Sequence, residues 1–187
     1  MKKLQEKPLA FVDVETTGLD PYEHTILEIA IIRTDTGEWS TKIKPTPEDI
    51  EKASTRALDV NRYSAEEWKD APPEGDVVAE ICKRLSGVII VAHNASFDKS
   101  FITELIKRQE RTENVGYHWL DTVSYAYEHL VPEGLNRLSL NAVCDHAGIS
   151  NEGAHRALTD ARRCKAVYYH CKSVHLFGAT TETPQST

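Results

Sequence analysis

Residues 11–21 constrain this chain more than any other segment, because they place two carboxylates on one apolar strand that ends in a turn. Alternate residues of a strand point to opposite faces, so Asp13 and Glu15 share one face while Val12 and Val14 share the other. Two neighbouring carboxylates at the end of a buried strand repel each other unless a cation or a shared proton lies between them. The segment therefore predicts half of a metal site.

The chain has a size that suits one domain with one core, at 187 residues and 40% hydrophobic content. We divide it into an N-terminal extension at residues 1–8, a folded domain at 9–176 and a polar tail at 177–187 that we expect to be disordered. No apolar run reaches membrane-spanning length, and residues 1–8 lack the apolar stretch of a secretory signal. We therefore expect a soluble, cytoplasmic protein with no membrane contact.

The charged and thiol side chains narrow the possible chemistry further. A formal net charge of −7 argues against a broad basic surface for nucleic acid, so any such contact should be short. There is no C-x-x-C pair, and we expect reduced thiols in the core rather than disulfides or a zinc site. The cysteines concerned are Cys82, Cys144, Cys164 and Cys171.

Strands and helices alternate along the predicted fold. Apolar strands at 9–14, 25–33 and 39–43, with a turn at 36–37, predict an antiparallel meander. The continuous apolar run at 88–91 predicts a strand covered on both faces, and a short strand is expected near 118–120. Residues 45–73 read as loop with two short helices. Helical spacing predicts helices over 74–85, 96–109, 122–130, 138–146 and 156–172.

A second carboxylate lies where a buried strand ends and a helix begins. Asp98 falls on the apolar stripe of the helix that follows, so an acid occupies a core-facing position in its first turns. Such burial costs several kcal/mol unless a partner compensates for it. The alternatives to a metal are a capping role at the helix start, or a salt bridge with Lys99 or Arg108.

A third acid repeats this arrangement in the last helical segment. Asp160 aligns with Cys164, Val167 and Cys171 at i+4, i+7 and i+11, and so lies on an apolar face. In a regular helix of ~3.6 residues per turn, His155 and Asp160 would lie about 140° apart. For both to reach one site, His155 must stand in the loop before the helix.

Together, four acids lie against the core at the ends of predicted elements, with one histidine at the rim: Asp13, Glu15, Asp98, Asp160 and His155. Four carboxylates around two hard cations about 3.5–4 Å apart form a phosphoryl-transfer centre. One ion activates the attacking water and the other stabilises the leaving oxygen. A histidine, with an ordinary pKa of about 6.5, suits the role of general base at neutral pH.

The ordered motifs D-x-E, H-N-x-x-F-D and H-x-x-x-x-D, with T-T-G after the first, resemble the DEDDh branch of the 3′–5′ exonucleases. This group includes the proofreading subunit of bacterial DNA polymerase III, ribonuclease T and oligoribonuclease. The resemblance spans roughly residues 9–171. It implies an α/β, ribonuclease-H-like fold with a five-stranded mixed sheet flanked by helices.

The resemblance also implies roles for individual residues, with two divalent cations, Mg²⁺ or Mn²⁺, as cofactors. Asp13 would lie between both metals, Glu15 and Asp160 would support the ion that activates water, Asp98 would help to hold the second ion, and His155 would be the base. Leu19 and Phe97 would wall the base pocket, with ordinary core packing as the alternative. The full set of implied substrate-binding residues is Thr16, Thr17, Gly18, Leu19, Ala57, Asn61, His93, Asn94 and Phe97.

Two further positions are interpreted through the same resemblance. Relatives often carry glycine where this chain has Arg62, which weakens the match around Ala57 and Asn61. Asp121 is commonly a helix-start residue in such proteins, and we interpret it as a cap rather than a metal ligand.

The implied function is a metal-dependent 3′–5′ exonuclease that releases nucleoside monophosphates from the 3′ ends of single-stranded DNA, in proofreading or end-trimming. The alternative is a 3′–5′ exoribonuclease that trims RNA ends or short oligoribonucleotides. A catalytically silent end-binding module is less favoured, because such a module would have little reason to keep the four acids and His155. A ribonuclease-H-type endonuclease is also less favoured, because it would not account for the H-x-x-x-x-D motif. Expected partners are single-stranded 3′ ends, with a DNA polymerase or a second copy of the chain beyond them.

Overall fold

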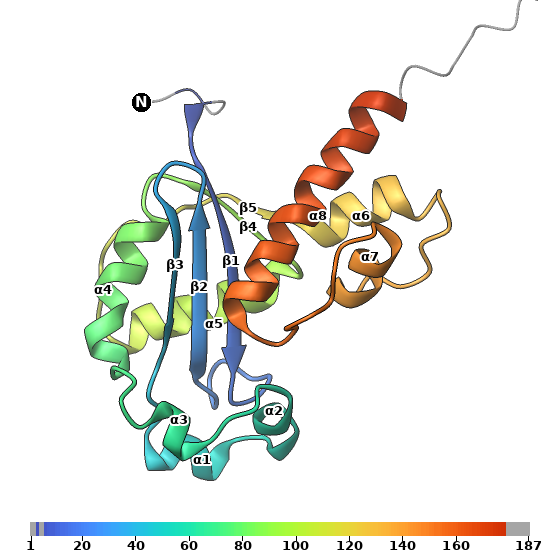
Figure 1. The fold of residues 1–187 in the computed structure, drawn as a ribbon. Coiled ribbons are helices and arrows are strands. Elements are labelled where there is room, and N and C mark those ends of the chain that lie inside the picture. The colour runs from blue at the N-terminus through green and yellow to red at the C-terminus, as the bar shows by residue number, and fades with distance from the viewer. Residues whose placement is uncertain (1–2, 4–5, 179–187) are drawn as a thin grey trace, which may run out of the picture.

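The sheet is five-stranded and mixed, as predicted. The computed structural model describes residues 3 and 6–178, and its strands lie in the order β3-β2-β1-β4-β5 (Figure 1). The first three strands form the expected antiparallel meander, while β4 and β5 run parallel to β1. The strands are β1 (Leu9–Thr16), β2 (Ile26–Arg33), β3 (Gly37–Lys42), β4 (Ile89–Ala92) and β5 (Trp119–Asp121).

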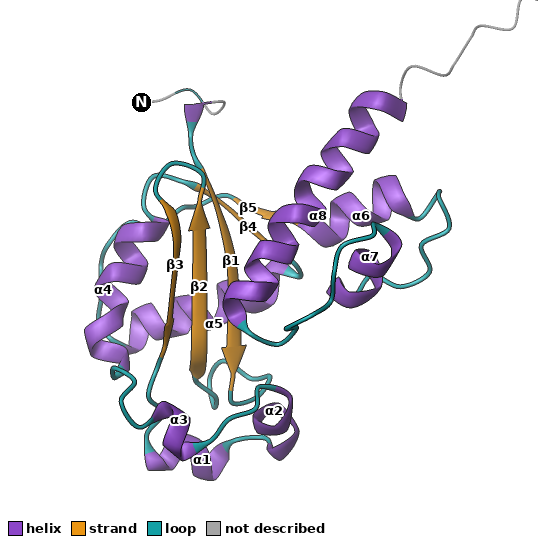
Figure 2. Ribbon diagram, in the orientation of Figure 1, coloured by secondary structure: helices purple, strands orange, loops and turns teal. Residues whose placement is uncertain are grey.

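Helices cover both faces of this sheet and one of its ends (Figure 2). Helices α4 and α5 pack on one face, while α8 packs on the other against β1 and β2, with α6 and α7 beside it. The short helices α1 to α3 lie below the end where β1 finishes. The helices are α1 (Pro47–Lys52), α2 (Thr55–Val60), α3 (Ala65–Trp68), α4 (Glu74–Leu85), α5 (Ala95–Arg108), α6 (Thr122–Leu130), α7 (Leu140–His146) and α8 (Ala157–Gly178).

The alternation of β1 divides its residues between two hydrophobic clusters. Val12 and Val14 pack into the cluster with α4 and α5, whereas Phe11 packs into the cluster with α8, where its ring centroid lies 5.5 Å from that of Tyr168. The face of Phe11 is also the face of the two acids that follow it at steps of two residues. Burial of the apolar residues of β1 therefore fixes the direction in which its carboxylates point.

Some element boundaries differ from the predictions for identifiable reasons. Residues 45–73 contain three short helices rather than two, because the four-residue α3 is anchored by Trp68, whose indole N–H donates to the Leu27 carbonyl at 3.0 Å. Helix α7 begins at Leu140 rather than at residue 138, because Ser139 caps it by accepting from the Ala142 N–H.

The two ends of the folded region also extend beyond the predicted limits. Strand β1 runs to Thr16, and α8 continues past residue 172 to Gly178, two residues into the predicted polar tail. The remainder of that tail, 179–187, lies outside the described residues. The division into an extension, a domain and a tail stays a prediction.

The structure also bears on smaller predictions from the sequence. Asp121 caps α6 by accepting from the Val123 N–H at 2.9 Å, which confirms its capping role. All four cysteines are buried and free. Arg62 has a φ of 51°, in the left-handed region that favours glycine, which explains why a glycine fits this position in relatives of the predicted family. Within the described part of the chain, none of the helices is long and apolar enough to cross a membrane.

Candidate active site

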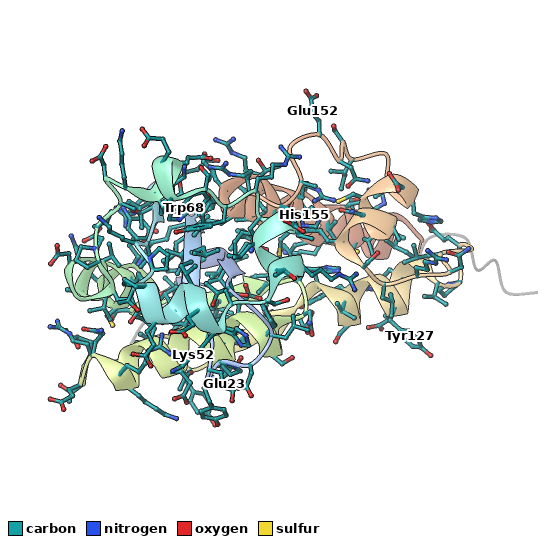
Figure 3. The ribbon with its side chains drawn as sticks, turned by 90° about the horizontal axis from the view of Figure 1, so that it is seen from below. Glu23, Lys52, Trp68, Tyr127, Glu152 and His155 are labelled. Atoms are coloured by element: carbon teal, nitrogen blue, oxygen red, sulfur yellow. The ribbon has the colours of Figure 1, made fainter. Side chains whose placement is uncertain are left out.

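The predicted acids and histidine meet at the end of the sheet where β1 finishes and α5 and α8 begin. Asp98 lies in the first turn of α5 and Asp160 in the first turn of α8, and both are buried, at 3% and 7% exposure. Figure 3 views the molecule from this end, with His155 near the middle of the face and Glu152 and Tyr127 at its periphery. Segments far apart in the sequence therefore contribute to one polar centre.

Backbone hydrogen bonds hold Asp98 in place. Its Oδ1 accepts from the Val14 N–H at 3.0 Å and so joins the start of α5 to β1. The N-terminus of α5 is instead capped by Asp121, whose two oxygens each accept a backbone N–H at 3.0 Å, from Asn94 and Ala95. Arg108 pairs with Glu74. Asp121 therefore supplies the cap, and Arg108, one of the two salt-bridge candidates for Asp98, is paired elsewhere.

His155 stands in the loop before α8, as the spacing predicted. Its φ of 66° is left-handed, and its backbone N–H donates to Asp160 Oδ2 at 3.2 Å. This turn brings the exposed imidazole back toward the first turn of the helix. One ligand atom each from Glu15, His155 and Asp160 lie within 4.8 Å of one another.

The electrostatics of the centre reflect crowded carboxylates. Burial raises the pKa of Glu15 to about 8, with repulsion from Asp160 and Glu28 adding to the shift. Burial also raises the pKa of Asp98 to about 8. The pKa of Asp13 is raised well above its ordinary range by burial and by repulsion from Asp98 and Glu15. Because these carboxylates repel one another, they do not readily ionise together. Bound divalent cations, which prefer oxygen ligands, would offset that repulsion.

The raised carboxyl pKa values predict a pH-dependent stability in the absence of metal. An unfolded carboxyl has a pKa of ~4, whereas burial raises the pKa of Glu15 in the folded protein to about 8, so the free energy of unfolding falls as the pH rises between these two values. In chelator, the melting temperature should fall by about 5 °C or more from pH 6 to pH 8.5. Scanning fluorimetry would measure the melting temperature, and Glu15→Gln should make it depend less on pH. A melting temperature that rises over this range would contradict the charge arrangement.

Two buried charged residues beside the site were not predicted from the sequence. Glu28 is directly opposite Glu15 in the β1–β2 register, accepts from the Ala157 N–H at 3.2 Å and pairs with Arg156 at 2.8 Å. Arg163 is 4% exposed and donates to Asp160 Oδ1 at 2.7 Å. Each carried a sequence signal: Glu28 is the one acid in an apolar strand, and Arg163 is three residues from Asp160 on a buried helix face.

A cavity of about 400 Å³ adjoins the acids. It contains six of the nine residues that the resemblance implied for substrate binding, and Glu15 belongs both to its lining and to the acidic centre. The six are Thr16, Gly18, Leu19, Ala57, Asn61 and Phe97, and the lining also includes Val14, Glu15, Ser54, Arg56 and Val60.

The apolar walls of this cavity have different degrees of burial. Leu19 is 82% exposed, so core packing does not account for it. The Phe97 ring lies against the core, 4.9 Å from the centroid of Phe101, while it also lines the cavity. Gly18 is closely packed, because a Cβ there would lie 2.2 Å from the His24 ring and the ring would have to move. The Asn61 amide donates to the Thr16 carbonyl at 2.8 Å and joins the end of β1 to α2.

The other three implied residues lie outside the cavity lining. Thr17 is fully buried, and its backbone N–H and C=O are hydrogen bonded to the protein. Both His93 ring nitrogens have protein partners, Thr122 Oγ1 and the Leu138 carbonyl, each at 2.8 Å. Asn94 is the left-handed residue before α5 and has its N–H bound by Asp121. All three residues are therefore hydrogen bonded to other parts of the protein and help to hold the site together.

Comparison with known proteins gives consistent matches. The family model RNase_T, described as "Exonuclease", matches residues 10–168. The PolC-type DNA polymerase III of Oceanobacillus iheyensis is 32% identical over 160 residues, which is 86% of this chain but 11% of that protein. The chain thus spans about a tenth of the length of such relatives. The DNA polymerase III subunit epsilon of Treponema pallidum is 29% identical over 166 residues, covering 83% of this chain and 72% of that protein.

A solved structure supports the fold. The zinc-bound complex of E. coli ExoI with single-stranded DNA superposes with a TM-score of 0.80 at 21% identity, over 92% of this chain and 42% of that one. This similarity extends over the sheet and its flanking helices, which agrees with the ribonuclease-H-like architecture predicted from the motifs.

Proposed function

The chain belongs to the exonuclease family whose model matches residues 10–168, and from that premise we propose that it is a metal-dependent 3′–5′ exonuclease of single-stranded DNA. It would release nucleoside monophosphates. The proposal is carried by one observation: Glu15 belongs both to the acidic centre and to the lining of the 400 Å³ cavity. A terminal nucleotide could place its base between Leu19 and Phe97 while its phosphate reaches the carboxylates.

The four acids Asp13, Glu15, Asp98 and Asp160 would hold two divalent cations, Mg²⁺ or Mn²⁺, because carboxylate oxygens are hard ligands. When bound, such ions lower the pKa of the attacking water and stabilise the leaving oxygen. The exposed His155 imidazole would accept the proton of that water. The hydrogen bond from the His155 backbone N–H to Asp160 holds this residue beside the acids. The cavity walls would hold the nucleotide in register with these groups.

The choice of DNA is supported by the relatives. Two are DNA polymerase III proteins, and a structural neighbour was solved with single-stranded DNA. Proofreading or end-trimming is therefore the proposed use, and association with a DNA polymerase or with a second copy of this chain stays a prediction. RNA trimming is the competing outcome that the experiment must separate.

Matched 5′-labelled single-stranded DNA and RNA oligonucleotides, incubated with Mg²⁺ or Mn²⁺, test this proposal. Stepwise shortening of the DNA with release of mononucleotides is expected, together with an uncut circular single strand. Shortening of RNA alone would move the function to RNA processing. Cleavage of the circle would show an endonuclease, and an inactive protein that still binds metal and DNA ends would be the silent module.

A further inference from the structure

Arg163 forms a buried hub behind the acidic centre. Its Nη1 donates to Asp160 Oδ1 at 2.7 Å, and its Nη2 donates to Asn141 Oδ1 at 2.6 Å and to Asn151 Oδ1. The side chain is 4% exposed, so these bonds of Nη1 and Nη2 replace water contacts that the guanidinium would otherwise make, while Nε is buried without a hydrogen-bond partner in the described part of the chain. One planar group therefore connects the first turns of α7 and α8 with the loop between these helices.

That loop also carries His155. Asn151 is tied at its far side as well, because its Nδ2 donates to the Asn141 carbonyl at 3.1 Å and to Asp145 Oδ1 at 2.5 Å. At the near side, the His155 N–H donates to Asp160 Oδ2. The two oxygens of Asp160 are thus bonded to Arg163 and to the His155 backbone. The segment from 151 to 155 is anchored at both ends through partners of one arginine.

We propose that Arg163 is a positioning residue, which sets the orientation of Asp160 and the place of His155 without touching substrate. This inference rests on the proposed exonuclease function. A left-handed residue such as His155 persists only where its surroundings hold it, and the hub supplies that support. Small misplacements of a catalytic group cost large factors in rate, so the hub should affect turnover more than substrate binding.

The neighbouring arginine provides a matched control. Arg162 is on the exposed side of α8 and pairs with Glu38 of β3, with 55% of its side chain accessible. It is adjacent in sequence and identical in charge, but within the described part of the chain its side-chain hydrogen bonds and ion pair are all with Glu38. Arg162→Gln therefore removes the same charge from the same helix and leaves the hub intact.

The experiment compares Arg163→Gln, Arg163→Lys and Arg162→Gln with the wild type by two measurements. The first is kcat and KM on a single-stranded oligonucleotide with Mg²⁺. The second is hydrogen exchange of the backbone amides of residues 151–156 in metal-free protein. We expect Arg163→Gln to lower kcat about 10–100-fold, to keep KM within ~3-fold and to speed exchange of the loop at least ~10-fold. Arg163→Lys, which keeps charge without the fork, should recover only part of the loss.

Wild-type kcat and loop exchange in Arg163→Gln would overturn the proposal, as would an equal effect of Arg162→Gln. If Arg163→Gln does not fold, Asn151→Ala removes only the loop side of the hub and should still speed exchange and lower kcat about 3–10-fold. Loop exchange unchanged in Asn151→Ala would also overturn the proposal. A wild type inactive on every substrate would refute the proposed function, while the exchange measurement would still test the hub.

Discussion

Replacement of Asp13 by alanine should abolish turnover while leaving the metal-free fold at least as heat-stable as the wild type. The carboxylate lies on β1 among Asp98, Glu15 and Asp160, which raise its pKa together with burial. Removing it relieves that repulsion in the absence of metal, and it also removes a central proposed metal ligand. We expect activity to fall at least about 10³-fold.

Thermal unfolding with and without Mg²⁺ or Mn²⁺ makes this prediction specific to the site. A cation that binds only the folded protein raises its melting temperature, so the wild type should gain stability with metal and Asp13→Ala should gain little. Asp70→Asn, which removes an exposed carboxylate from the turn after α3, is the control and should behave as wild type. A large drop in the melting temperature of metal-free Asp13→Ala would count against a strained acidic centre.

The acids were predictable from local sequence because each stands out against an apolar pattern. Strand alternation placed Asp13 and Glu15 on one face, and helical spacing put Asp98 and Asp160 on buried stripes. The spacing before α8 also required His155 to lie in a loop, as the structure has it. In these cases hydrophobic burial of the neighbours determines where the polar side chain points.

The partners of those acids could not be predicted in the same way, because they depend on pairing between distant segments. Glu28 meets Glu15 only through the β1–β2 register, and Asp121 reaches the start of α5 only because β5 lies beside β4. The resemblance implied a substrate contact for His93, but both of its ring nitrogens are held by protein groups, one of them 45 residues away. Side-chain hydrogen bonds of this kind leave no periodic trace in a sequence.

Loss of the His155 imidazole should slow catalysis about 10²–10⁴-fold at neutral pH, the usual contribution of a positioned general base. The backbone complicates a simple deletion, since a φ of 66° is costly for most residues but is better tolerated by asparagine than by alanine. His155→Asn and His155→Ala should therefore be compared. Both lack the proton acceptor, whereas only His155→Ala adds backbone strain to the loop.

If the imidazole is the base, the two variants should lose similar factors in single-turnover rate while they still bind metal through the carboxylates. His146→Ala, which removes an exposed imidazole from the last turn of α7, should keep the wild-type rate. A wild-type rate in His155→Asn together with a slow His155→Ala would mean that this position matters only for the turn into α8. Because Asp160 accepts the His155 backbone N–H, that result would assign the effect to Asp160 and its hub rather than to the imidazole.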